Sequence, residues 1–464
     1  MGKQFEESQV KEVMEACKGF VNVWIQPFNP DKETKKEVLV QVIPDGDDEE
    51  PSIELDIYTY SLINRIWDHA LSRKGEEFQK PHLFLYRFTA RATEENIAIS
   101  SHLREIGIND AGWIKATLYS ELKDSQEGLR GSLTLWCGDV TSVPAFLADF
   151  NTITRTDSDK IHSTTEFIDR IIDNQFFEFP APTAKGSIPK RDYSVDLYKV
   201  GSANSALITN TENCKSLLID GGIDRYYPNK YSQAEDAIKK LNPEHILISH
   251  NHEDHLNLLY ISVSTQGLVL GIKTNSLESV IMLETAIDDN QKLFSEQLLR
   301  SYFGKRLKII PDKTNFRGRH FLKDFPVIQL HRGTCKDKSM CVVSAQSYYE
   351  NDTGMIVTID NKQMLILSGD CSYDFFPSSV RLIDADYIVV PHHGGKTKMK
   401  NRNIMVNNPN CLAIVSSRYG SFFPSTAKNY QKQLDQEIFL KQIGITQPVQ
   451  FLENLNGAVY SFTV

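Results

Sequence analysis

Four potential metal ligands lie within six consecutive residues: His250, His252, Asp254 and His255. They follow the apolar run 246–248, which predicts a β-strand, and the intervening Ser249. A strand that ends in a loop would present these side chains at one edge, where imidazole nitrogens and a carboxylate oxygen can converge on one or two metal ions. The cluster therefore predicts a metal-dependent hydrolase. The alternative is a polar helix start with Asp254 near the N-cap.

Three further apolar strands end in residues that could bind or orient a metal. The run 217–219 leads into Asp220, the run 364–367 leads through Ser368 and Gly369 into Asp370, and the run 387–390 leads into Pro391, His392 and His393. Each motif alone is a common strand-to-turn pattern. Together they place Asp and His repeatedly at strand ends, which predicts one shared site.

With these motifs in this order, the chain resembles the metallo-β-lactamase superfamily, and within it the branch of the competence DNA-uptake protein ComEC and related phosphoesterases. The resemblance covers residues 194–464 and rests on the segments LLIDGG, HxHxDH, SGD and VPHHGG, with residues 350–355 similar to the branch's ND.S stretch. It implies an α/β fold with a four-layer αββα sandwich. The chain departs from the pattern at residues 200–206, which lack the GD pair, and at Phe423, which replaces a histidine.

The resemblance implies a site for two divalent ions, zinc or manganese. Its metal ligands would be His250, His252, Asp254, His255, Asp370 and His393, with Asp370 bridging both ions. His392 would face the substrate as a phosphate contact or proton donor, and Asp220 would hold a ligand imidazole in one tautomer. The third ligand of the first ion stays open between His331, Asn351 and a water molecule.

Two metal ions can lower the pKa of a bridging water and supply a hydroxide that attacks phosphorus or a carbonyl carbon. The fold alone does not decide between these electrophiles. We expect Asp254, His392 and Lys396 to take part in catalysis. The alternatives are hydrolysis of a carbon electrophile (a lactam, lactone or thioester) and a catalytically reduced, metal-stabilised scaffold in a multi-protein defence or DNA-processing complex.

The distribution of basic residues favours a phosphodiester substrate, in DNA, RNA or a nucleotide. Lys396, Lys398, Lys400 and Arg402 directly follow the HHGG motif. Residues 300–338 contain eleven basic residues against three acidic ones, interleaved with the aromatic residues Tyr302, Phe303, Phe316, Phe321 and Phe325. Basic residues with aromatic ones suit a groove that follows the phosphate backbone and stacks bases. The alternative is a solvated basic face with the aromatic rings in the core.

At 464 residues the chain predicts more than one domain. The Pro/Ala/Gly/Ser-rich stretch near residues 179–193 breaks helix and strand periodicity and predicts a linker between an N-terminal α/β domain at 1–178 and the hydrolase domain at 194–464. In the first domain we expect helices near 8–18 and 62–71 and strands at 21–25, 38–43, 83–88 and 133–137. In the second we expect strands at 195–200, 206–209, 217–220 and 245–249, and a helix at 235–241.

Charge differs between the two parts of the chain. Residues 1–190 contain 32 acidic against 21 basic residues, whereas residues 191–464 contain 28 against 30. The acidic part should repel polyanions, and we expect it to bind a protein partner or to regulate the hydrolase domain. Its histidines are isolated and show no catalytic motif.

No segment approaches the roughly 18 apolar residues of a membrane span, and the start lacks an apolar signal region. The seven cysteines are scattered without CxxC spacing, which argues against a disulfide framework. A cytoplasmic protein with no membrane partner is expected.

Overall fold

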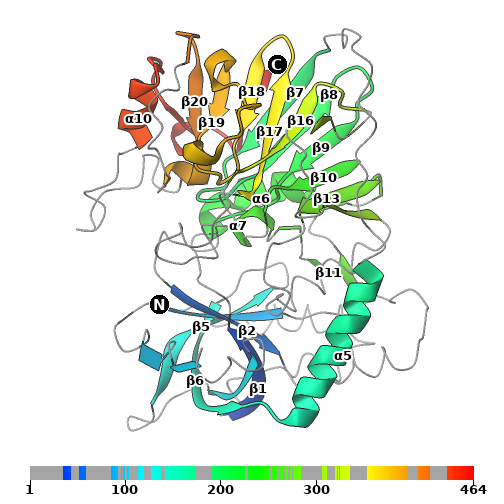
Figure 1. The fold of residues 1–464 in the computed structure, drawn as a ribbon, viewed down its shortest axis with the longest axis vertical. Coiled ribbons are helices and arrows are strands. Elements are labelled where there is room, and N and C mark those ends of the chain that lie inside the picture. Colours follow the sequence, from blue (N-terminus) through cyan, green and yellow to red (C-terminus); the bar gives the residue numbers. More distant parts are fainter. Residues whose placement is uncertain are drawn as a thin grey trace. The chain divides into compact units, whose positions relative to one another are not determined.

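A computed structural model describes part of the chain: residues 35–42, 52–58, 85–91, 93, 96, 98–99, 102–103, 113–119, 127–136, 142–172, 191–224, 228–250, 253–256, 258–259, 262–264, 267–269, 272–273, 275–283, 306–310, 319–320, 322, 324–334, 353–395, 397, 406–417 and 436–464. The chain packs as two compact units (Figure 1). The first unit takes in the segment 260–271, with its hairpin β11 (Ser262–Ser264) and β12 (Gly267–Val269), although this segment lies between strands of the second unit in sequence.

The described strands of the first unit close into an antiparallel barrel in the order β1-β2-β3-β5-β6-β4. These strands are β1 (Lys35–Val42), β2 (Ser52–Tyr58), β3 (Leu85–Arg91), β4 (Trp113–Tyr119), β5 (Gly128–Trp136) and β6 (Ser142–Thr152). Buried side chains such as Leu55, Phe88 and Leu147 fill the interior, so the barrel has a packed core. The helix α5 (Arg155–Ile172) follows, with Thr154 accepting a hydrogen bond from the backbone N–H of Asp157 at its start.

The barrel corrects the prediction for residues 1–178, because the described part of this unit is a closed antiparallel barrel with α5 in place of an α/β arrangement. The strands expected at 38–43, 83–88 and 133–137 correspond to β1, β3 and β5. The strand expected at 21–25 and the helices expected at 8–18 and 62–71 lie outside the described residues. The long strand β6 was not predicted, because Pro144 and the left-handed Asp149 (φ 55°) interrupt its alternating pattern of apolar and polar residues.

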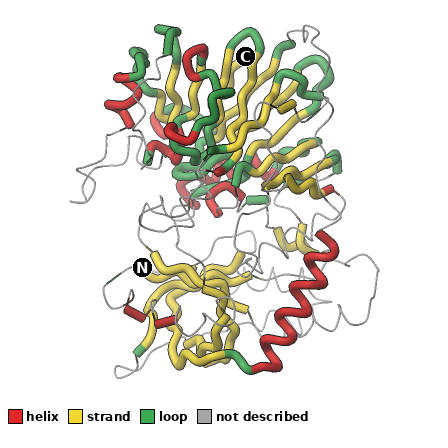
Figure 2. Tube along the Cα trace, viewed as in Figure 1, coloured by secondary structure: helices red, strands yellow, loops and turns green. Residues whose placement is uncertain are grey.

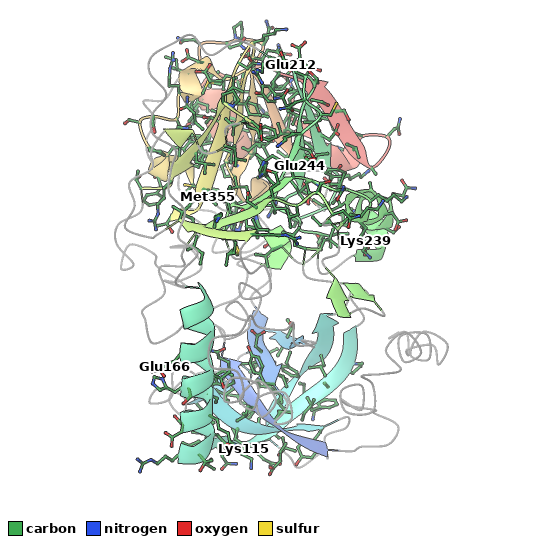
Figure 3. The ribbon with its side chains drawn as sticks, turned by 90° about the vertical axis from the view of Figure 1, so that its right-hand side faces the viewer. Lys115, Glu166, Glu212, Lys239, Glu244 and Met355 are labelled. Atoms are coloured by element: carbon green, nitrogen blue, oxygen red, sulfur yellow. The ribbon has the colours of Figure 1, made fainter. Side chains whose placement is uncertain are left out.

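Two ion pairs lie on the described surface of this unit. Lys115 on β4 pairs with Glu37 on β1 across the barrel surface, at 2.9 Å from Nζ to Oε2. Glu166 on α5 lies one helical turn from His162, at 3.2 Å from Oε1 to Nε2 (Figure 3). The His162–Glu166 pair is exposed and Glu37 of the other pair is exposed too, so these ion pairs contribute little to stability.

The second unit contains two seven-stranded sheets. The first sheet has the order β14-β13-β10-β9-β8-β7-β22 and comprises β7 (Tyr193–Tyr198), β8 (Ala206–Asn210), β9 (Ser216–Ile219), β10 (His245–Ile248), β13 (Ser279–Leu283), β14 (Leu307–Ile310) and β22 (Val459–Thr463). The second has the order β15-β16-β17-β18-β19-β20-β21 and comprises β15 (Arg319–His320), β16 (Ile328–Arg332), β17 (Met355–Asp360), β18 (Met364–Leu367), β19 (Tyr387–Val389), β20 (Leu412–Val415) and β21 (Gln450–Phe451).

The strands predicted at 195–200, 206–209, 217–220 and 245–249 are confirmed as β7, β8, β9 and β10. The predicted helix at 235–241 is α6 (Ser232–Lys239). Short apolar runs punctuated by turn residues made these elements readable from the sequence.

One hydrophobic core joins the two sheets. Leu247 and Ile281 of the first sheet belong to the same buried cluster as Val357 and Leu365 of the second. Neighbouring residues on the second sheet, such as Ile356, point the other way into a separate cluster. This alternation is the period of two that a β-strand imposes, and it shows that both faces of the second sheet are covered.

The helix α10 (Gln436–Gln442) contributes Phe439 and Leu440 to the cluster on the outer face of the second sheet. The described residues are nevertheless mostly strands (Figure 2), with α6, α7 (Glu253–Leu256) and α10 as short helices. The two inner sheets match the predicted sandwich, whereas the complete four-layer αββα arrangement is not established by these elements. In the described part of the chain, none of the helices has the length and apolar character to span a bilayer.

Replacing Leu247 by alanine tests the common core. The side chain is fully buried between the sheets, so Leu247→Ala should lower the free energy of unfolding of this unit by about 2–5 kcal/mol. Ile438→Ala is the matched control, because Ile438 is 49% exposed and should change stability by less than about 0.5 kcal/mol. Urea unfolding followed by circular dichroism measures both, and equal effects would contradict the shared core.

Candidate metal centre

The predicted site residues follow strands that run parallel within each sheet. In the first sheet β9 and β10 are parallel, so Asp220 and the Ser249–His250 pair emerge at the same edge. In the second sheet β18 and β19 are parallel, and they deliver Asp370 and the His392–His393 pair in the same way. The backbone N–H of Met355 on β17 donates to the carbonyl of Ser249 at 2.9 Å, which joins the two sheets beside the site.

Asp220 organises the first-sheet side of the centre. Its Oδ1 accepts a hydrogen bond from the backbone N–H of Ser249 at 2.7 Å, and its Oδ2 accepts one from the Ser249 hydroxyl at 2.9 Å. The same Oδ2 lies 2.8 Å from Nδ1 of His255. A buried carboxylate in this position favours the tautomer in which Nδ1 carries the proton, and the lone pair of His255 then resides on Nε2.

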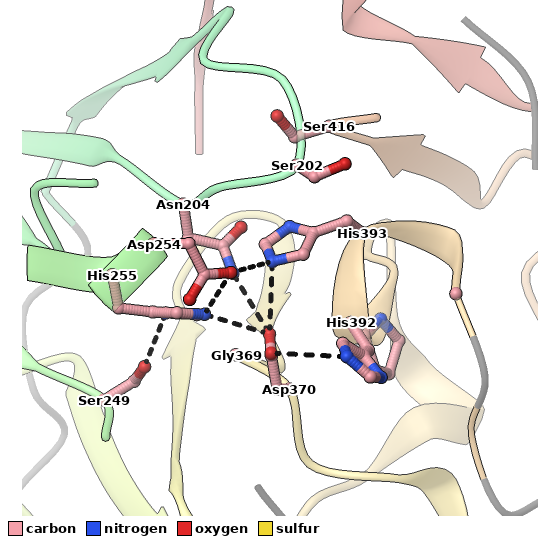
Figure 4. Close-up of polar contacts among 12 residues, drawn as sticks. Ser202, Asn204, Ser249, Asp254, His255, Gly369, Asp370, His392, His393 and Ser416 are labelled. Atoms are coloured by element: carbon pink, nitrogen blue, oxygen red, sulfur yellow. Dashed lines mark hydrogen bonds and ion pairs between the residues drawn. The ribbon is translucent and has the colours of Figure 1, made fainter. Parts of the chain in front are cut away.

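The Nε2 atom of His255 points toward the remaining donors. It is buried and makes no hydrogen bond to any described group, and it lies 3.2 Å from Oδ1 of Asp370 and 3.8 Å from Oδ2 of Asp254. Nε2 of His393 lies 3.0 Å from Oδ2 of Asp254 and 3.8 Å from Oδ1 of Asp370 (Figure 4). One ligand atom from each of these four side chains lies within 4.8 Å of all the others.

This donor set fits a divalent metal ion. Two imidazole nitrogens and two carboxylate oxygens suit zinc or manganese, and the lone pair on His255 Nε2 is directed by Asp220 as in known carboxylate–histidine–metal arrangements. The structure therefore brings Asp254, His255, Asp370 and His393 together as a group that could hold a metal ion.

The charges of these buried side chains also favour a cation. Burial lowers the pKa of His255, but the carboxylates of Asp370, Asp254 and Asp220 outweigh it and raise that pKa well above its ordinary value. Burial raises the pKa of Asp370, yet the neighbouring His255 and His393 hold it well below its usual range. Carboxylates that stay ionised while buried need positive charge beside them, and a divalent ion supplies it.

Strained backbone positions aim the ligands. Asp220, His392 and His393 all have left-handed φ values of 51–55°, a conformation that costs roughly 1–2 kcal/mol for a residue with a Cβ atom. The side-chain amide of Gln436, at the start of α10, donates to the carbonyls of Pro391 and Gly395 at 3.2 and 2.6 Å. Gln436 thus closes the turn that presents both histidines.

Gly222 allows the short helix α7 to approach. A Cβ atom on Gly222 would lie 1.5 Å from the backbone oxygen of Asp254, so no other residue fits without moving the helix. The N–H of Gly221 also donates to the carbonyl of His255 at 2.7 Å. The Gly221–Gly222 pair therefore fixes how α7 carries Asp254 and His255 to the site.

The other predicted site residues divide into three groups. His250 lies at the site, with its Nε2 3.8 Å from Oδ2 of Asp370, and His392 lies 4.0 Å from the same oxygen. His252, Asn351 and Lys396 lie outside the residues whose side chains the structure describes. His331 is engaged elsewhere, because its Nδ1 lies 2.9 Å from the Ser379 hydroxyl and its Nε2 2.8 Å from the Thr358 hydroxyl.

His331 is therefore a structural residue of the second sheet and not the third ligand of the first ion. Burial lowers its pKa to about 4, so the ring is neutral near pH 7 and satisfied by the two hydroxyls. His331 was considered as a ligand because it follows a strand-like run, but in the structure its ring lies against Thr358 on β17.

Three residues at the site were given no role from the sequence. The side-chain amide of Asn204 donates to Oδ1 of Asp370 at 3.4 Å, and the Ser249 hydroxyl lies within 3.1–3.2 Å of Nδ1 of both His250 and His255. Asn204 lies in the segment 200–206, which precedes the other motifs in the sequence, and this position could have pointed to a role at the site. The role of Gln436 could not be predicted from the sequence, because this residue lies 45 residues from Pro391 and belongs to no motif.

One aromatic residue of the predicted nucleic-acid groove belongs to the core. Phe325 is fully buried and packs near Tyr193 and His245, with ring centroids 6.2 and 6.0 Å apart. It cannot stack on a base, which corrects its proposed role. Tyr302, Phe303, Phe316 and Phe321 lie outside the described residues.

A second convergence of donors, at His245, Glu278 and Asp324, lies at the opposite end of β10. The ammonium group of Lys215 already binds both carboxylates there, at 3.1 Å from Glu278 and 2.8 Å from Asp324. The side chain of Glu278 is also exposed. We therefore describe this group as a surface ion-pair cluster.

No family model and no curated protein matches the chain. Among solved structures it is similar to the metallo-beta-lactamase fold protein YhfI from Bacillus subtilis, at 10% sequence identity and a TM-score of 0.29, over 58% of this chain and 99% of that one. A similarity at this level carries no argument about family or function. None of these comparisons supports the ComEC-like branch that the motifs resemble.

Asp220→Asn tests the orienting role of this carboxylate. The variant keeps the four converging donors but removes the charge that holds the His255 tautomer, so metal affinity should fall about 10- to 100-fold. Equilibrium dialysis against zinc or manganese measures the loss. Asp384→Asn is the matched control, since Asp384 lies on the surface in an ion pair with Arg381. Unchanged affinity in Asp220→Asn would contradict the assignment.

Gly222→Ala tests the approach of α7. The added methyl group must displace the backbone of Asp254, so we expect metal binding to be lost while the rest of the second unit stays folded. Gly457→Ala is the control, because a Cβ atom there meets nothing within 4 Å. Metal binding by dialysis and near-ultraviolet circular dichroism should separate the two variants, and normal binding by Gly222→Ala would refute this description of the site.

Proposed function

We propose that this chain is a metal-dependent hydrolase of the metallo-β-lactamase type, with the catalytic centre in its second unit. The observation that carries the proposal is the convergence of Asp254, His255, Asp370 and His393 at the strand ends of two packed sheets. The order of the motifs along the chain and the two-sheet core support the same assignment. Among the described residues, the group with fully buried donors that could hold a metal ion lies in this unit.

A bound divalent ion would polarise the scissile ester and lower the pKa of a water molecule at the site. The chain's own residues prepare that chemistry. Asp220 and Ser249 fix the ring of His255, and the amide of Asn204 holds Asp370. With these groups held before substrate arrives, little reorganisation is needed during the reaction.

The proposed substrate is a phosphodiester of DNA, RNA or a nucleotide. Its support is the basic sequence Lys396 to Arg402, which starts immediately after the Gly395 that ends the ligand-bearing turn. Positive charge that follows the ligand-bearing turn so closely in sequence would attract an anionic ester and stabilise the charge that develops on it. A neutral lactam or thioester would gain nothing from this charge.

The acidic first unit is proposed to bind a protein partner. Residues 1–190 carry the acidic surplus of the chain, and the barrel has a core packed with apolar side chains. A filled barrel offers its outer surface, and an acidic surface favours a basic partner.

The double variant Asp254→Ala/His255→Ala tests the proposed function. The full chain, supplied with manganese or zinc, should hydrolyse bis(p-nitrophenyl) phosphate or a single-stranded oligonucleotide, and the double variant should lose at least about 1,000-fold in kcat/KM because ligands on one ion are missing. His162→Ala is the control, because His162 is exposed on α5.

Parallel assays with a chromogenic lactam and a thioester decide the substrate class. Turnover of these compounds without phosphodiester cleavage would overturn the phosphodiester assignment. Phosphodiester turnover that survives in the double variant would overturn the metal centre as its source.

A further inference from the structure

A second group of donor atoms lies at the start of β10, whereas the candidate metal centre lies beyond the end of this strand. The group consists of the imidazole of His245 and the carboxylates of Glu278 and Asp324. Nε2 of His245 lies 3.9 Å from Oε2 of Glu278 and 4.0 Å from Oδ2 of Asp324. These separations are too long for hydrogen bonds, so the imidazole faces both carboxylates without binding either.

The ring of His245 has one nitrogen that nothing satisfies in the described part of the chain. Its side chain is 5% exposed, and Nε2 is buried with no hydrogen-bond partner among the described groups. Nδ1 lies 2.9 Å from the Ser279 hydroxyl, and a proton on Nδ1 that is donated to this oxygen leaves the lone pair on Nε2. Burial lowers the pKa of His245 below its ordinary value, so the ring is neutral near pH 7. A cation between Nε2 and the carboxylates would satisfy this lone pair.

Hydrogen bonds hold the backbone at both carboxylates. The N–H of Glu278 donates to the carbonyl of Glu244 at 2.7 Å, and the side-chain amide of Asn210 donates to the carbonyl of Asp324 at 3.0 Å. Glu278 directly precedes β13 of the first sheet, and Asp324 precedes β16 of the second. An ion bound by both carboxylates would therefore connect the two sheets at a position remote from the catalytic centre.

Lys215 places an ammonium group between the same carboxylates. Its Nζ lies 3.1 Å from Oε1 of Glu278 and 2.8 Å from Oδ2 of Asp324, yet Nε2 of His245 stays without a hydrogen bond to any described group. A divalent ion can accept lone pairs from all three donors, which the ammonium group does not do here. The side chain of Lys215 is 32% exposed, so its flexible stem can turn the charge into solvent when an ion enters.

We propose that His245, Glu278 and Asp324 form a zinc site separate from the catalytic centre, in which Zn²⁺ displaces the ammonium group of Lys215. When Lys215 holds the position, the same residues form the surface ion-pair cluster described above. One imidazole and two carboxylates suit Zn²⁺, with water completing a tetrahedral set. Mn²⁺ should bind more weakly, as the usual order of affinities for divalent ions requires. The inference goes beyond the proposed function and does not depend on it.

The distances are compatible with this ion. Bonds of about 2.1 Å in a tetrahedral set place the donor atoms about 3.4 Å apart, whereas Nε2 of His245 lies 3.9 and 4.0 Å from the two carboxylates. The side chain of Glu278 is 53% exposed and that of Asp324 is 32% exposed. Both can therefore move toward the buried ring, and the half-exposed carboxylate of Glu278 gives the ion a route from solvent.

Zinc binding to the full-length chain tests the proposal. The parent for all variants carries Asp254→Ala and His255→Ala, which weaken the catalytic centre, and bound zinc is measured by equilibrium dialysis with elemental analysis. Glu278→Gln should bind one ion fewer than the parent, or bind that ion at least about 100-fold more weakly, because loss of a mere supporting residue already costs about 10- to 100-fold. Glu437→Gln is the matched control, since this carboxylate pairs with Lys441 at 2.6 Å on α10, and it should bind zinc like the parent.

Lys215→Met should change the affinity in the opposite direction. The substitution removes the charge that competes with the ion, so zinc should bind about 10-fold more tightly than in the parent. Lys441→Met removes an ammonium group from the ion pair on α10 and should leave the affinity unchanged. Lys215 and Glu278 are partly exposed, so their replacement does not disturb the packing of the buried His245 ring against Phe325.

Glu278→His separates coordination from ion pairing. This variant returns a ligand for zinc but no negative charge for Lys215, so it should recover the ion that Glu278→Gln loses. Failure of Glu278→His to bind more zinc than Glu278→Gln would overturn the proposal.

Two other outcomes would also overturn it. Glu278→Gln may equal the parent in the number and affinity of bound ions, or Lys215→Met may fail to tighten binding, and in either case the cluster is an ion pair only. Zinc binding that depends on Glu278, in a wild-type chain that hydrolyses no ester, would support this inference while refuting the proposed function.

Discussion

The hydrogen bonds of Asp220 are the interaction on which the metal centre depends. One carboxylate fixes the backbone of Ser249, the Ser249 hydroxyl and the ring of His255, so the end of β10 and the start of α7 are held by the same group. Asp220 itself is held in a left-handed conformation while its N–H donates to the carbonyl of Leu247. The strain at this position is offset by contacts that give every nearby ligand a single orientation.

Both sheets contribute side chains to the candidate metal centre. Asp254 and His255 follow the first sheet, whereas Asp370, His392 and His393 follow the second, and Asp370 contacts imidazoles from both. Because the sheets meet through one apolar core, the ligand distances depend on how well that core is packed. Residues far from the metal, such as Leu247, thereby influence the geometry of the site.

The sequence predicted the centre better than its surroundings. Histidine and aspartate at the ends of apolar runs are local signals, and parallel strands bring such ends together, so Asp254, His255, Asp370 and His393 could be named in advance. The barrel was less readable, because Pro144 and the left-handed Asp149 break the alternation of β6. The contact of Gln436 with the ligand-bearing turn could not be predicted, since a hydrogen bond between residues 45 positions apart leaves no pattern in a single sequence.

The long sequence separation of the ligands gives the centre a part in folding. Asp254 and His393 are 139 residues apart, so their donors meet only after both sheets have formed and docked. An unfolded chain holds the same side chains too far apart to bind an ion together. Any ion that binds the assembled centre therefore acts as a thermodynamic clamp on the sandwich, adding about 2.7 kcal/mol of stability at a free concentration of about 100 times Kd.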